Sequence, residues 1–341
     1  MSGVSLGWGI IGIGNIVKGT IAPAMVGESS CELVAAVSRD NARAKDFATA
    51  FGARYAYTDY EEMLANPAVD AVFIATPNGL HADQVVAAAL AGKHVLCDKP
   101  LAINVPDAFR AVEACQQAGV KLGVNFHNRH LQWVADVSGL IGDGTIGTVQ
   151  VVELEVSSGV RTWDNWRADR GMAGLGSIHN VGVHGLDFLR VILRAEPVEV
   201  MAMFDRPATS DVVESLGLVL IRFDNGTLAY CNFNESVANP VNELRIFGST
   251  GRMIGRGFTR SRIDGDLTIL TGSSERRTDY PAPDAHRLSV VAFTVAVLSG
   301  EEPNASGLDG LRSAQLCDAI ERSVNERRLV EVDYGHPAGA A

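Results

Sequence analysis

The chain has 341 residues, of which 47% are hydrophobic and 20% charged, so it has enough apolar side chains for a large core and too many for a disordered protein. Its formal net charge of −11 argues against a protein that tracks a nucleic-acid duplex, because such binding needs a surplus of cations. No stretch approaches the roughly 20 apolar residues that span a bilayer, and the N-terminus lacks the basic segment of a signal peptide. The 5 cysteines are widely spaced without a C-x-x-C pair. We therefore expect a soluble, cytoplasmic protein of about two domains with reduced thiols and neither nucleic-acid nor membrane partners.

The first part of the chain alternates short apolar runs with helical patterns, which is typical of a parallel α/β sheet. Strands are expected at residues 6–11, 33–37, 71–75, 94–97 and 120–124. Helices are expected at residues 81–91 and 107–118, each followed by a glycine at the usual helix stop. The pattern predicts a doubly wound parallel sheet over residues 1–124, with ligands at the carboxyl ends of its strands.

Five polar or glycine-rich segments follow these strands. They are residues 12–15, 38–40, 76–78, 98–100 and 125–129. Because the carboxyl ends of parallel strands share one edge of a sheet, these five segments should meet on one rim. Five loops on one rim indicate a ligand site more strongly than any single motif does.

The first of these loops, Gly12-Ile-Gly14-Asn-Ile-Val17, has the spacing of a dinucleotide-binding turn between a strand and a helix. Gly12 would make the tight turn, and Gly14 would let the backbone approach a pyrophosphate at the helix N-terminus. Val17 stands at the third glycine position, which predicts looser packing of helix on strand. A glycine-rich turn without a ligand is the alternative, and the overlapping literal match that begins at Gly7 lies in the strand and is a decoy. The cofactor candidates of this loop are Gly12, Gly14, Asn15 and Ile16.

The end of the second strand should discriminate between the two nicotinamide cofactors. An NAD site usually has an acidic residue there for the ribose 2′-hydroxyl, whereas this chain has Ser38 and Arg39. Arg39 could meet a 2′-phosphate through charge-assisted hydrogen bonds, so we predict that NADP(H) is preferred. NAD(H) stays possible if the strand ends later and Asp40 takes the acidic role. A solvated Arg39 beside a helix-capping Ser38 is the alternative without a ligand.

From residue 125 on the pattern changes to longer strands, expected at residues 149–157, 198–204, 216–223, 227–233 and 242–247. The segment Asp224-Asn-Gly226 predicts a hairpin between two of them. Helical patterns occur at residues 130–141, 177–193, 285–298 and 308–325. We predict a substrate-binding and oligomerisation domain over residues 125–335, built on a large open, mostly antiparallel α+β sheet, and a disordered tail at residues 336–341.

The expected strand at residues 216–223 is apolar on both faces, because Leu216, Leu218 and Leu220 alternate with Val219, Ile221 and Phe223. Helices can cover one face, and a second subunit is the natural cover for the other. Loops of the same chain are the alternative. We predict a homodimer or homotetramer.

Two places could carry acid–base chemistry. Asn180, His184 and Asp187 are spaced i, i+4, i+7, so they lie on one face of a helix, where a polar neighbour could orient the imidazole for proton transfer. Lys99 follows the strand at residues 94–97, where its ammonium could polarise a substrate oxygen. The alternatives are a packed structural histidine and a solvated lysine. The pair His127 and His130 has no carboxylate or cysteine cluster beside it, so no metal site is predicted.

Three segments, Thr76-Pro77-Asn78, His81 and Ala91–Leu101, resemble the Gfo/Idh/MocA family of oxidoreductases. The resemblance extends over essentially the whole chain and includes the glycine turn, Trp166-Arg167 and the helix with His184. It implies an N-terminal Rossmann domain and a C-terminal α/β domain whose open sheet makes oligomer contacts. It also implies NAD(P)-dependent hydride transfer between nicotinamide and a sugar, anhydrosugar or cyclitol.

The resemblance assigns roles to individual residues. The lysine of the family's E-K-P motif, which contacts the cofactor and the reacting oxygen, is Lys99, with Asp98 in place of Glu. The acid–base histidine of its D-x-x-x-H motif is His184, with Asn180 in place of Asp. An amide cannot stabilise an imidazolium by charge, so Asp187 is a possible charge partner. The implied cofactor contacts further include Ser38, Arg39, Thr76, Pro77, Asn78, His81, Asp98 and Arg167, and the implied substrate contacts are Lys99, Asn125, Arg129, Asn180, His184 and Asp187.

Two other functions stay open at this point. One is a glycoside-cleaving enzyme that keeps its NAD bound and regenerates it in every cycle. The other is a non-catalytic NAD(P)-binding regulator, which the substitution at Asn180 keeps under consideration.

Overall fold

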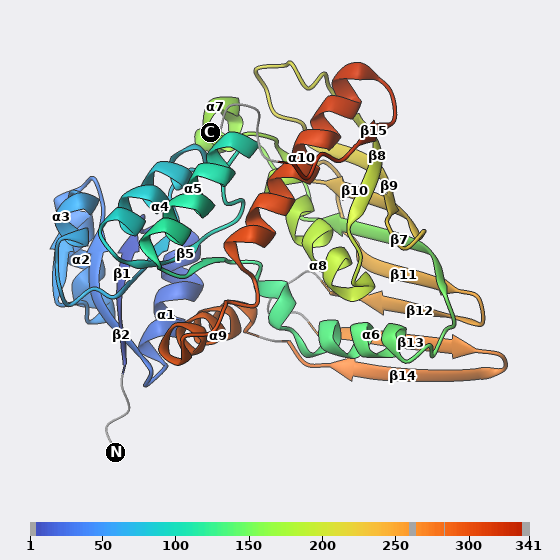
Figure 1. The fold of residues 1–341 in the computed structure, drawn as a ribbon, viewed down its shortest axis with the longest axis horizontal. Coiled ribbons are helices and arrows are strands. Elements are labelled where there is room, and N and C mark those ends of the chain that lie inside the picture. The colour runs from blue at the N-terminus through green and yellow to red at the C-terminus, as the bar shows by residue number, and fades with distance from the viewer. Residues whose placement is uncertain (1–4, 259–263, 283, 336–341) are drawn as a thin grey trace. The chain divides into compact units, whose positions relative to one another are not determined.

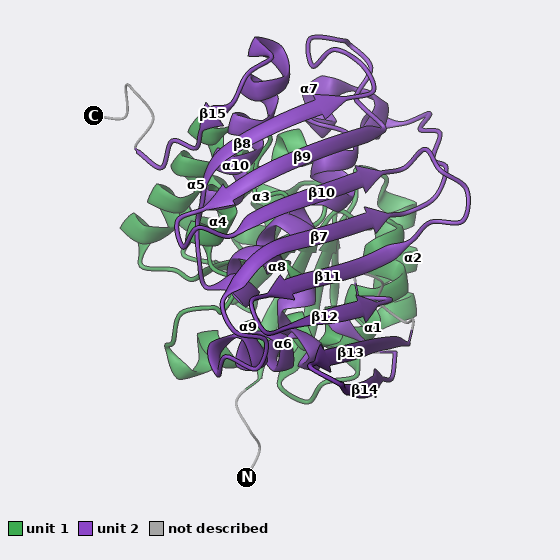
Figure 2. Ribbon diagram, turned by 90° about the vertical axis from the view of Figure 1, so that its right-hand side faces the viewer, with its two compact units in different colours: residues 1–127, 286–311, 337–341 green, residues 128–285, 312–336 purple. Residues whose placement is uncertain are grey.

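The structure, a computed structural model, describes residues 5–258, 264–282 and 284–335, and it divides the chain into two compact units (Figures 1 and 2). Unit 1 comprises residues 1–127, 286–311 and 337–341, and unit 2 comprises residues 128–285 and 312–336. Each unit contains one sheet. The tail predicted at residues 336–341 lies outside the described residues.

Unit 1 is built on a six-stranded parallel sheet in the order β3-β2-β1-β4-β5-β6, the doubly wound order of a Rossmann fold. The strands are β1 (Leu6–Ile11), β2 (Cys31–Val37), β3 (Tyr55–Tyr57), β4 (Ala71–Ile74), β5 (His94–Cys97) and β6 (Leu122–Val124). β1 and β4 are buried along their whole length because helices cover both faces of a parallel sheet, which explains their unbroken apolar runs. The predicted fold class is confirmed.

The helices of unit 1 begin and end where local chemistry dictates. Those that connect the strands are η1 (Val17–Ile21), α1 (Ala22–Val26), α2 (Asn41–Phe51), α3 (Tyr60–Leu64), η2 (Asn78–Leu80), α4 (His81–Leu90) and α5 (Val105–Ala118). The side chain of Asp59 caps α3, and that of Asn104 caps α5. Gly92 and Gly119 follow α4 and α5 with φ of 70° and 67°, a left-handed conformation that favours glycine.

A late segment of the chain returns to unit 1, which differs from the two contiguous domains expected. Helix α9 (Ala285–Ser299) packs its Phe293 ring 5.6 Å from the ring of Trp8 in β1. Its Thr294 hydroxyl lies 3.3 Å from the Cys31 thiol in β2. Residues 286–311 therefore complete the core of the first sheet instead of belonging to the second.

Unit 2 contains a nine-stranded sheet in the order β14-β13-β12-β11-β7-β10-β9-β8-β15. Its strands are β7 (Val149–Ser157), β8 (Pro197–Phe204), β9 (Leu216–Phe223), β10 (Leu228–Asn234), β11 (Asn242–Gly248), β12 (Gly251–Arg256), β13 (Gly265–Thr271), β14 (Ser274–Tyr280) and β15 (Val330–Glu331). Described neighbours pair antiparallel except β7 and β10, which are parallel. The predicted mostly antiparallel sheet is confirmed, and the strands β12 to β15 extend it beyond the expected elements.

One face of this sheet is packed and the other is open. The helices of unit 2 are η3 (His127–His130), α6 (Gln132–Gly142), η4 (Trp166–Ala168), α7 (Arg170–Ala173), η5 (Ile178–Gly182), α8 (Val183–Leu193) and α10 (Gly307–Glu326), whose first turn belongs to unit 1. The Trp133 ring of α6 meets Phe188 of α8 edge-on at 5.4 Å and stacks on Phe258 at 4.0 Å. Figure 2 looks onto the opposite face, where strands β8, β9, β10, β7 and β11 lie in front of α6 and α8.

All 5 cysteines are free and buried. None of the helices in the described part of the chain has the length and apolar character that crossing a membrane requires.

Candidate functional site

The glycine turn of unit 1 has the form that a dinucleotide cradle needs. Gly12 has φ of 93°, and a Cβ there would lie 2.8 Å from the carbonyl oxygen of Ala75, so only glycine fits. A Cβ on Gly14 would meet no atom within 4 Å, so open space lies where a pyrophosphate would approach the backbone. Val17 is fully buried, and the helix begins there with the wide π turn η1. Val17, the residue at the third glycine position, is the first residue of this turn.

The end of β2 brings three polar side chains beside this turn. β2 ends at Val37, so Ser38 is the first residue beyond the strand, and Arg39 is exposed. The Asp40 carboxylate caps α2 by accepting the backbone N–H of Arg43 at 3.1 Å. Arg43, which the sequence analysis missed, donates from Nη2 to the carbonyl oxygen of Ile13 at 2.8 Å. Its place in the first turn of the helix that follows the second strand is the signal that could have found it.

His81 connects two of the predicted rim loops. Its Nδ1 lies 2.8 Å from the Pro100 carbonyl oxygen, and its Nε2 lies 2.9 Å from the Thr76 carbonyl oxygen. Burial lowers the pKa of this imidazole, and a neutral ring can donate to only one of the two carbonyls at a time. The Thr76 hydroxyl also donates to Gln84 at 2.6 Å. His81, which was predicted as a cofactor contact, is thus only 1% exposed. It lies between the loop that begins at Thr76 and the loop that ends at Pro100.

Lys99 is half-buried on the same rim, two residues beyond β5, and its peptide bond to Pro100 is cis. The carboxylate of Asp98 accepts a hydrogen bond from Asn125 Nδ2 at 3.1 Å. Asn125 was predicted to contact the substrate, but its side chain is fully buried and its Nδ2 lies 3.4 Å from Nδ1 of His286. The His286 ring in turn lies 4.0 Å from the ring of His127, the first histidine of the H-x-x-H pair. Asn125 therefore supports the loop that carries Lys99.

In unit 2, η5 and α8 carry the predicted acid–base residues. Two glycines let these helices approach the sheet closely, since a Cβ on Gly182 would lie 3.2 Å from the Phe233 ring and one on Gly185 would lie 2.8 Å from Leu154. Asn180 and His184 are half-buried. Asn180 lies in the π turn η5, which has more residues per turn than an α-helix. Asn180 therefore departs from the regular α-helical face on which the sequence placed it with His184 and Asp187.

A buried carboxylate fixes the start of these helices. Glu214 accepts the backbone N–H of Gly176 at 2.7 Å through Oε2 and that of Ile178 at 3.0 Å through Oε1. Burial raises the pKa of Glu214 to about 7. Sequence analysis missed Glu214 because it lies more than 30 residues from the backbone that it caps.

A second buried carboxylate meets Asn180 directly. Asn180 Nδ2 donates to Glu235 Oε1 at 2.5 Å, and the Ser158 hydroxyl donates to the same oxygen at 2.9 Å. A carboxylate only accepts hydrogen bonds, so the amide nitrogen of Asn180 must face Glu235. The D-x-x-x-H motif that this segment resembles has an aspartate where this chain has Asn180. The amide of Asn180 is held by Glu235, which follows the carboxyl end of β10.

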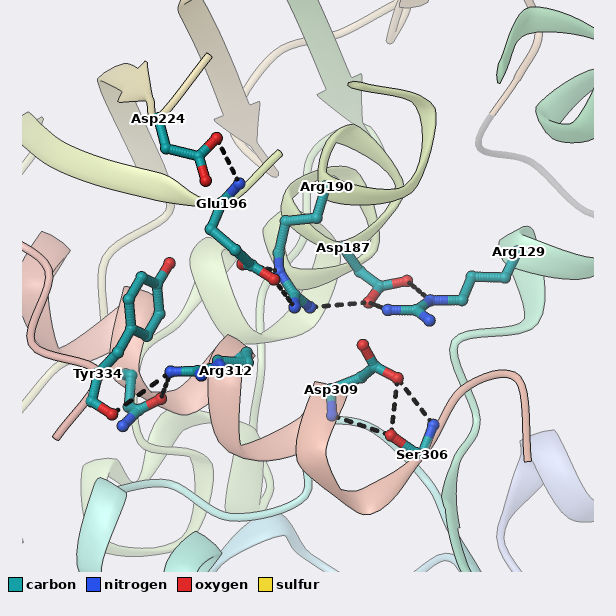
Figure 3. A network of polar contacts seen from close by, with 10 residues as sticks. Arg129, Asp187, Arg190, Glu196, Asp224, Ser306, Asp309, Arg312 and Tyr334 are labelled. Atoms are coloured by element: carbon teal, nitrogen blue, oxygen red, sulfur yellow. Dashed lines mark hydrogen bonds and ion pairs between the residues drawn. The ribbon is translucent and has the colours of Figure 1, made fainter. Parts of the chain in front are cut away.

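Asp187 lies between two arginines. Arg129 binds it at two points, with Nε–Oδ2 of 2.7 Å and Nη2–Oδ1 of 2.6 Å, and Arg190 Nη1 lies 3.9 Å from Oδ1 (Figure 3). Arg190 continues to Glu196 through two bonds of 2.6 Å. Arg129 and Asp187, both predicted as substrate contacts, are thus joined in one buried ion pair.

Arg167 lies on η4 in unit 2, with its guanidinium 4.3 Å from the ring centre of Trp166 and 5.0 Å from that of Trp163. Stacking of this kind holds the cation in a defined orientation. Of the predicted residues, Lys99 and the cofactor loops belong to unit 1, while Arg167, Asn180 and His184 belong to unit 2.

Known proteins resemble this chain over nearly its whole length. Residues 6–126 match the model of an oxidoreductase family with an NAD-binding Rossmann fold, and residues 134–254 match the GFO/IDH/MocA C-terminal domain. The 1,5-anhydro-D-fructose reductase of Ensifer adhaerens is 30% identical over 96% of this chain and 99% of its own. The D-xylose 1-dehydrogenase (NADP(+)) 2 of Haloferax volcanii is 31% identical over 96% and 99%. The crystal structure of aldose-aldose oxidoreductase from Caulobacter crescentus, complexed with glycerol, superposes with a TM-score of 0.87 at 29% identity, covering 96% of this chain and 99% of that one.

Proposed function

This chain belongs to the Gfo/Idh/MocA family of NAD(P)-dependent oxidoreductases, and we propose that it interconverts a CH–OH group and a ketone on a sugar, anhydrosugar or cyclitol. The observation that carries the proposal is the carboxyl edge of the unit 1 sheet. There the open cradle at Gly14 and the half-buried Lys99 follow β1 and β5 of the same sheet. The related proteins named above act on a sugar or an anhydrosugar, which supports this substrate class.

Different residues would bind the cofactor, polarise the substrate and transfer the proton. A nicotinamide cofactor, when bound, would supply or accept the hydride. Gly12, Gly14, Asn15 and Ile16 would hold its pyrophosphate, and Lys99 would polarise the substrate oxygen on the reacting carbon. His184 would donate or accept the proton of that oxygen, with Asn180 beside it on the preceding turn. The remaining expected cofactor contacts are Thr76, Pro77, Asn78, His81, Asp98 and Arg167.

The ion pair of Arg129 and Asp187 leaves both residues a different role from the one predicted. Because each group satisfies the other, we assign them to holding α8, and through it His184, rather than to substrate contact. Asn125 likewise supports Asp98.

Preference for NADP(H) is part of the proposal. It is supported by Ser38 at the end of β2, by Asp40 being engaged as a helix cap, and by the guanidinium of Arg43 beside the glycine turn. The name of the xylose dehydrogenase relative also specifies NADP. The test is kcat/KM for NADP(H) against NAD(H). We expect the higher value with NADP(H) and a selective loss of NADP(H) use in Arg39→Ala, whereas a higher value with NAD(H) would remove the assignment of Ser38 and Arg39.

A second copy of the chain as partner is also proposed. On the open face of the unit 2 sheet, Met201, Leu220 and Tyr230 are 43%, 52% and 41% exposed, on three adjacent strands. An apolar patch of this kind on a sheet face marks an interaction surface. Sedimentation at micromolar concentration should show a dimer or tetramer, and a monomer would contradict the proposal.

The activity itself is tested by absorbance of the reduced nicotinamide. The panel contains 1,5-anhydro-D-fructose with NADPH, and D-xylose and myo-inositol with NADP⁺. Net cofactor turnover with at least one of them is the expected result. A 4-nitrophenyl glycoside is assayed separately, and its cleavage without net cofactor turnover would indicate the enzyme that regenerates its cofactor. Cofactor binding without any reaction would indicate a regulator.

A further inference from the structure

Glu235 lies at a position where parallel strands bring polar groups together. It directly follows β10, and Ser158 directly follows β7. These two strands are the parallel pair of the described part of the sheet, with Asn234 paired to Ser157. Their carboxyl ends therefore meet at one edge, the kind of place where α/β sheets bind ligands. The helix turn that carries Asn180 packs over these same strands.

The carboxylate of Glu235 is buried with only one of its oxygens engaged. The residue is 3% exposed. Asn180 and Ser158 both donate to Oε1, and among the described residues no donor meets Oε2 and no lysine, arginine or histidine pairs with the group. Oε2 is therefore left to accept a hydrogen bond from outside the protein, either from water or from a ligand.

Glu214 shows what a purely structural carboxylate looks like in the same unit. Both of its oxygens accept backbone N–H groups at the start of the same helix. Both oxygens of Glu214 are therefore engaged by the helix that it caps. Glu235, by contrast, uses one oxygen to hold Asn180 and keeps the other unengaged by the protein.

We propose that Oε2 of Glu235 accepts a hydrogen bond from a hydroxyl group of the substrate and so selects for a hydroxylated carbon at that position of the sugar or polyol. This inference rests on the proposed function, because a sugar or cyclitol supplies hydroxyl donors beside the reacting carbon. Oε1 keeps the Asn180 amide in place, so binding and positioning come from the two oxygens of one side chain. A site built to bond a hydroxyl discriminates strongly against an analogue that lacks it.

The substitution Glu235→Gln separates these two tasks. The glutamine amide can keep its oxygen on Asn180 and Ser158, and it then presents an NH₂ group where Oε2 stood. The acceptor for a hydroxyl is thereby changed into a donor, while the contacts within the protein stay. Ser158→Ala is the matched control, because it removes a donor from Oε1 and leaves Oε2 unchanged.

The experiment measures kcat/KM for wild type, E235Q and S158A on the panel compound that the wild type turns over fastest, and on its monodeoxyfluoro analogues. Fluorine cannot donate a hydrogen bond. We expect the wild type to lose about tenfold to a hundredfold on one analogue, as for hydrogen bonds to charged groups. On the parent compound, kcat/KM of E235Q should be lower than that of the wild type by a similar factor. On the fluoro analogue, kcat/KM of E235Q should fall by no more than about threefold further, because the hydrogen bond is already lost. S158A should discriminate between the two compounds as the wild type does.

The outcomes separate this inference from the proposed function. If the wild type turns over a panel compound and E235Q keeps the full wild-type discrimination at every position, water alone fills the place at Oε2 and the inference is wrong. If the wild type turns over none of the panel, the proposed function fails and the inference fails with it. Cofactor binding and thermal unfolding of E235Q, which should both match the wild type, show that the variant is folded.

Discussion

Arg129 and Asp187 form a buried ion pair with two parallel hydrogen bonds, which joins η3 to α8 (Figure 3). Their side chains are 5% and 2% exposed. Arg190 and Glu196 extend the pair toward the start of β8. The geometry is the forked one that arginine and carboxylate adopt when both are held in place. The pair fixes the helix that carries His184.

Removing one partner of this pair should destabilise the protein strongly. Arg129→Ala and Asp187→Ala each leave an uncompensated buried charge, so we expect each to lower the free energy of unfolding by about 3–5 kcal/mol. The double variant should lose less than the sum of the two. Urea unfolding of the three variants and the wild type measures this. Single losses below 1 kcal/mol that simply add would show that the ion pair contributes little.

The stability of the protein should depend on pH through Glu214. Burial raises the pKa of its carboxyl from 4.5 to about 7, so the folded state favours the protonated form. Its contribution to stability is full below pH 4.5 and is lost as the pH rises through 7. Relative to Glu214→Gln, which does not titrate, the wild type should lose about 2 kcal/mol of unfolding free energy between pH 5 and pH 8. Urea unfolding of both proteins at the two pH values measures it, and a difference that does not change with pH would contradict this role of Glu214.

Close packing of α8 on the sheet should make Gly185 sensitive to substitution. A Cβ at Gly185 would lie 2.8 Å from Leu154 and 3.0 Å from the Phe233 ring. Gly185→Ala should therefore lower the unfolding free energy by about 1–3 kcal/mol. It should also lower kcat, because α8 carries His184, while NADP(H) affinity stays unchanged because the glycine turn belongs to unit 1.

Gly139 in α6 provides the matched control, since a Cβ there would meet nothing within 4 Å. Gly139→Ala should stabilise the protein by up to about 1 kcal/mol and leave kcat unchanged. If both alanine variants behave alike, the close approach at Gly185 has no functional effect.

Most of the fold could be predicted because its strands have clear boundaries. β1, β5, β7 and β9 match their expected bounds, since each is a regular apolar or alternating run between turn residues. β14 could not be found in this way. Its sequence, Ser274–Tyr280, is polar along nearly its whole length and exposed, so no periodicity distinguishes it from a loop. Likewise, an amphipathic pattern reveals α9 but not which of the two sheets it packs against.

The site was predictable where a residue's place follows from its strand. Gly12, Ser38 and Lys99 all follow the carboxyl ends of parallel strands, so order along the chain was sufficient. Pairs that are distant in sequence were not predictable: Glu235 is 55 residues from Asn180, and Asp187 is 58 from Arg129. The contact of Glu235 depends on the parallel pairing of β7 with β10 and on the π turn at Asn180, and the contact of Asp187 depends on how η3 meets α8. None of these features leaves a periodic signal in the sequence.

Replacement of Lys99 by alanine tests whether its ammonium polarises the reacting oxygen. The measurement is the initial rate of NADPH absorbance change with the best panel compound for wild type, Lys99→Ala and the control Lys121→Ala, whose side chain pairs with Glu302 on the surface of unit 1. We expect K99A to lose about 2.7–4 kcal/mol of transition-state stabilisation, a fall in kcat of about 10²–10³, and K121A to stay at the wild-type rate. If K99A turns over at close to the wild-type rate, Lys99 has no part in the reaction.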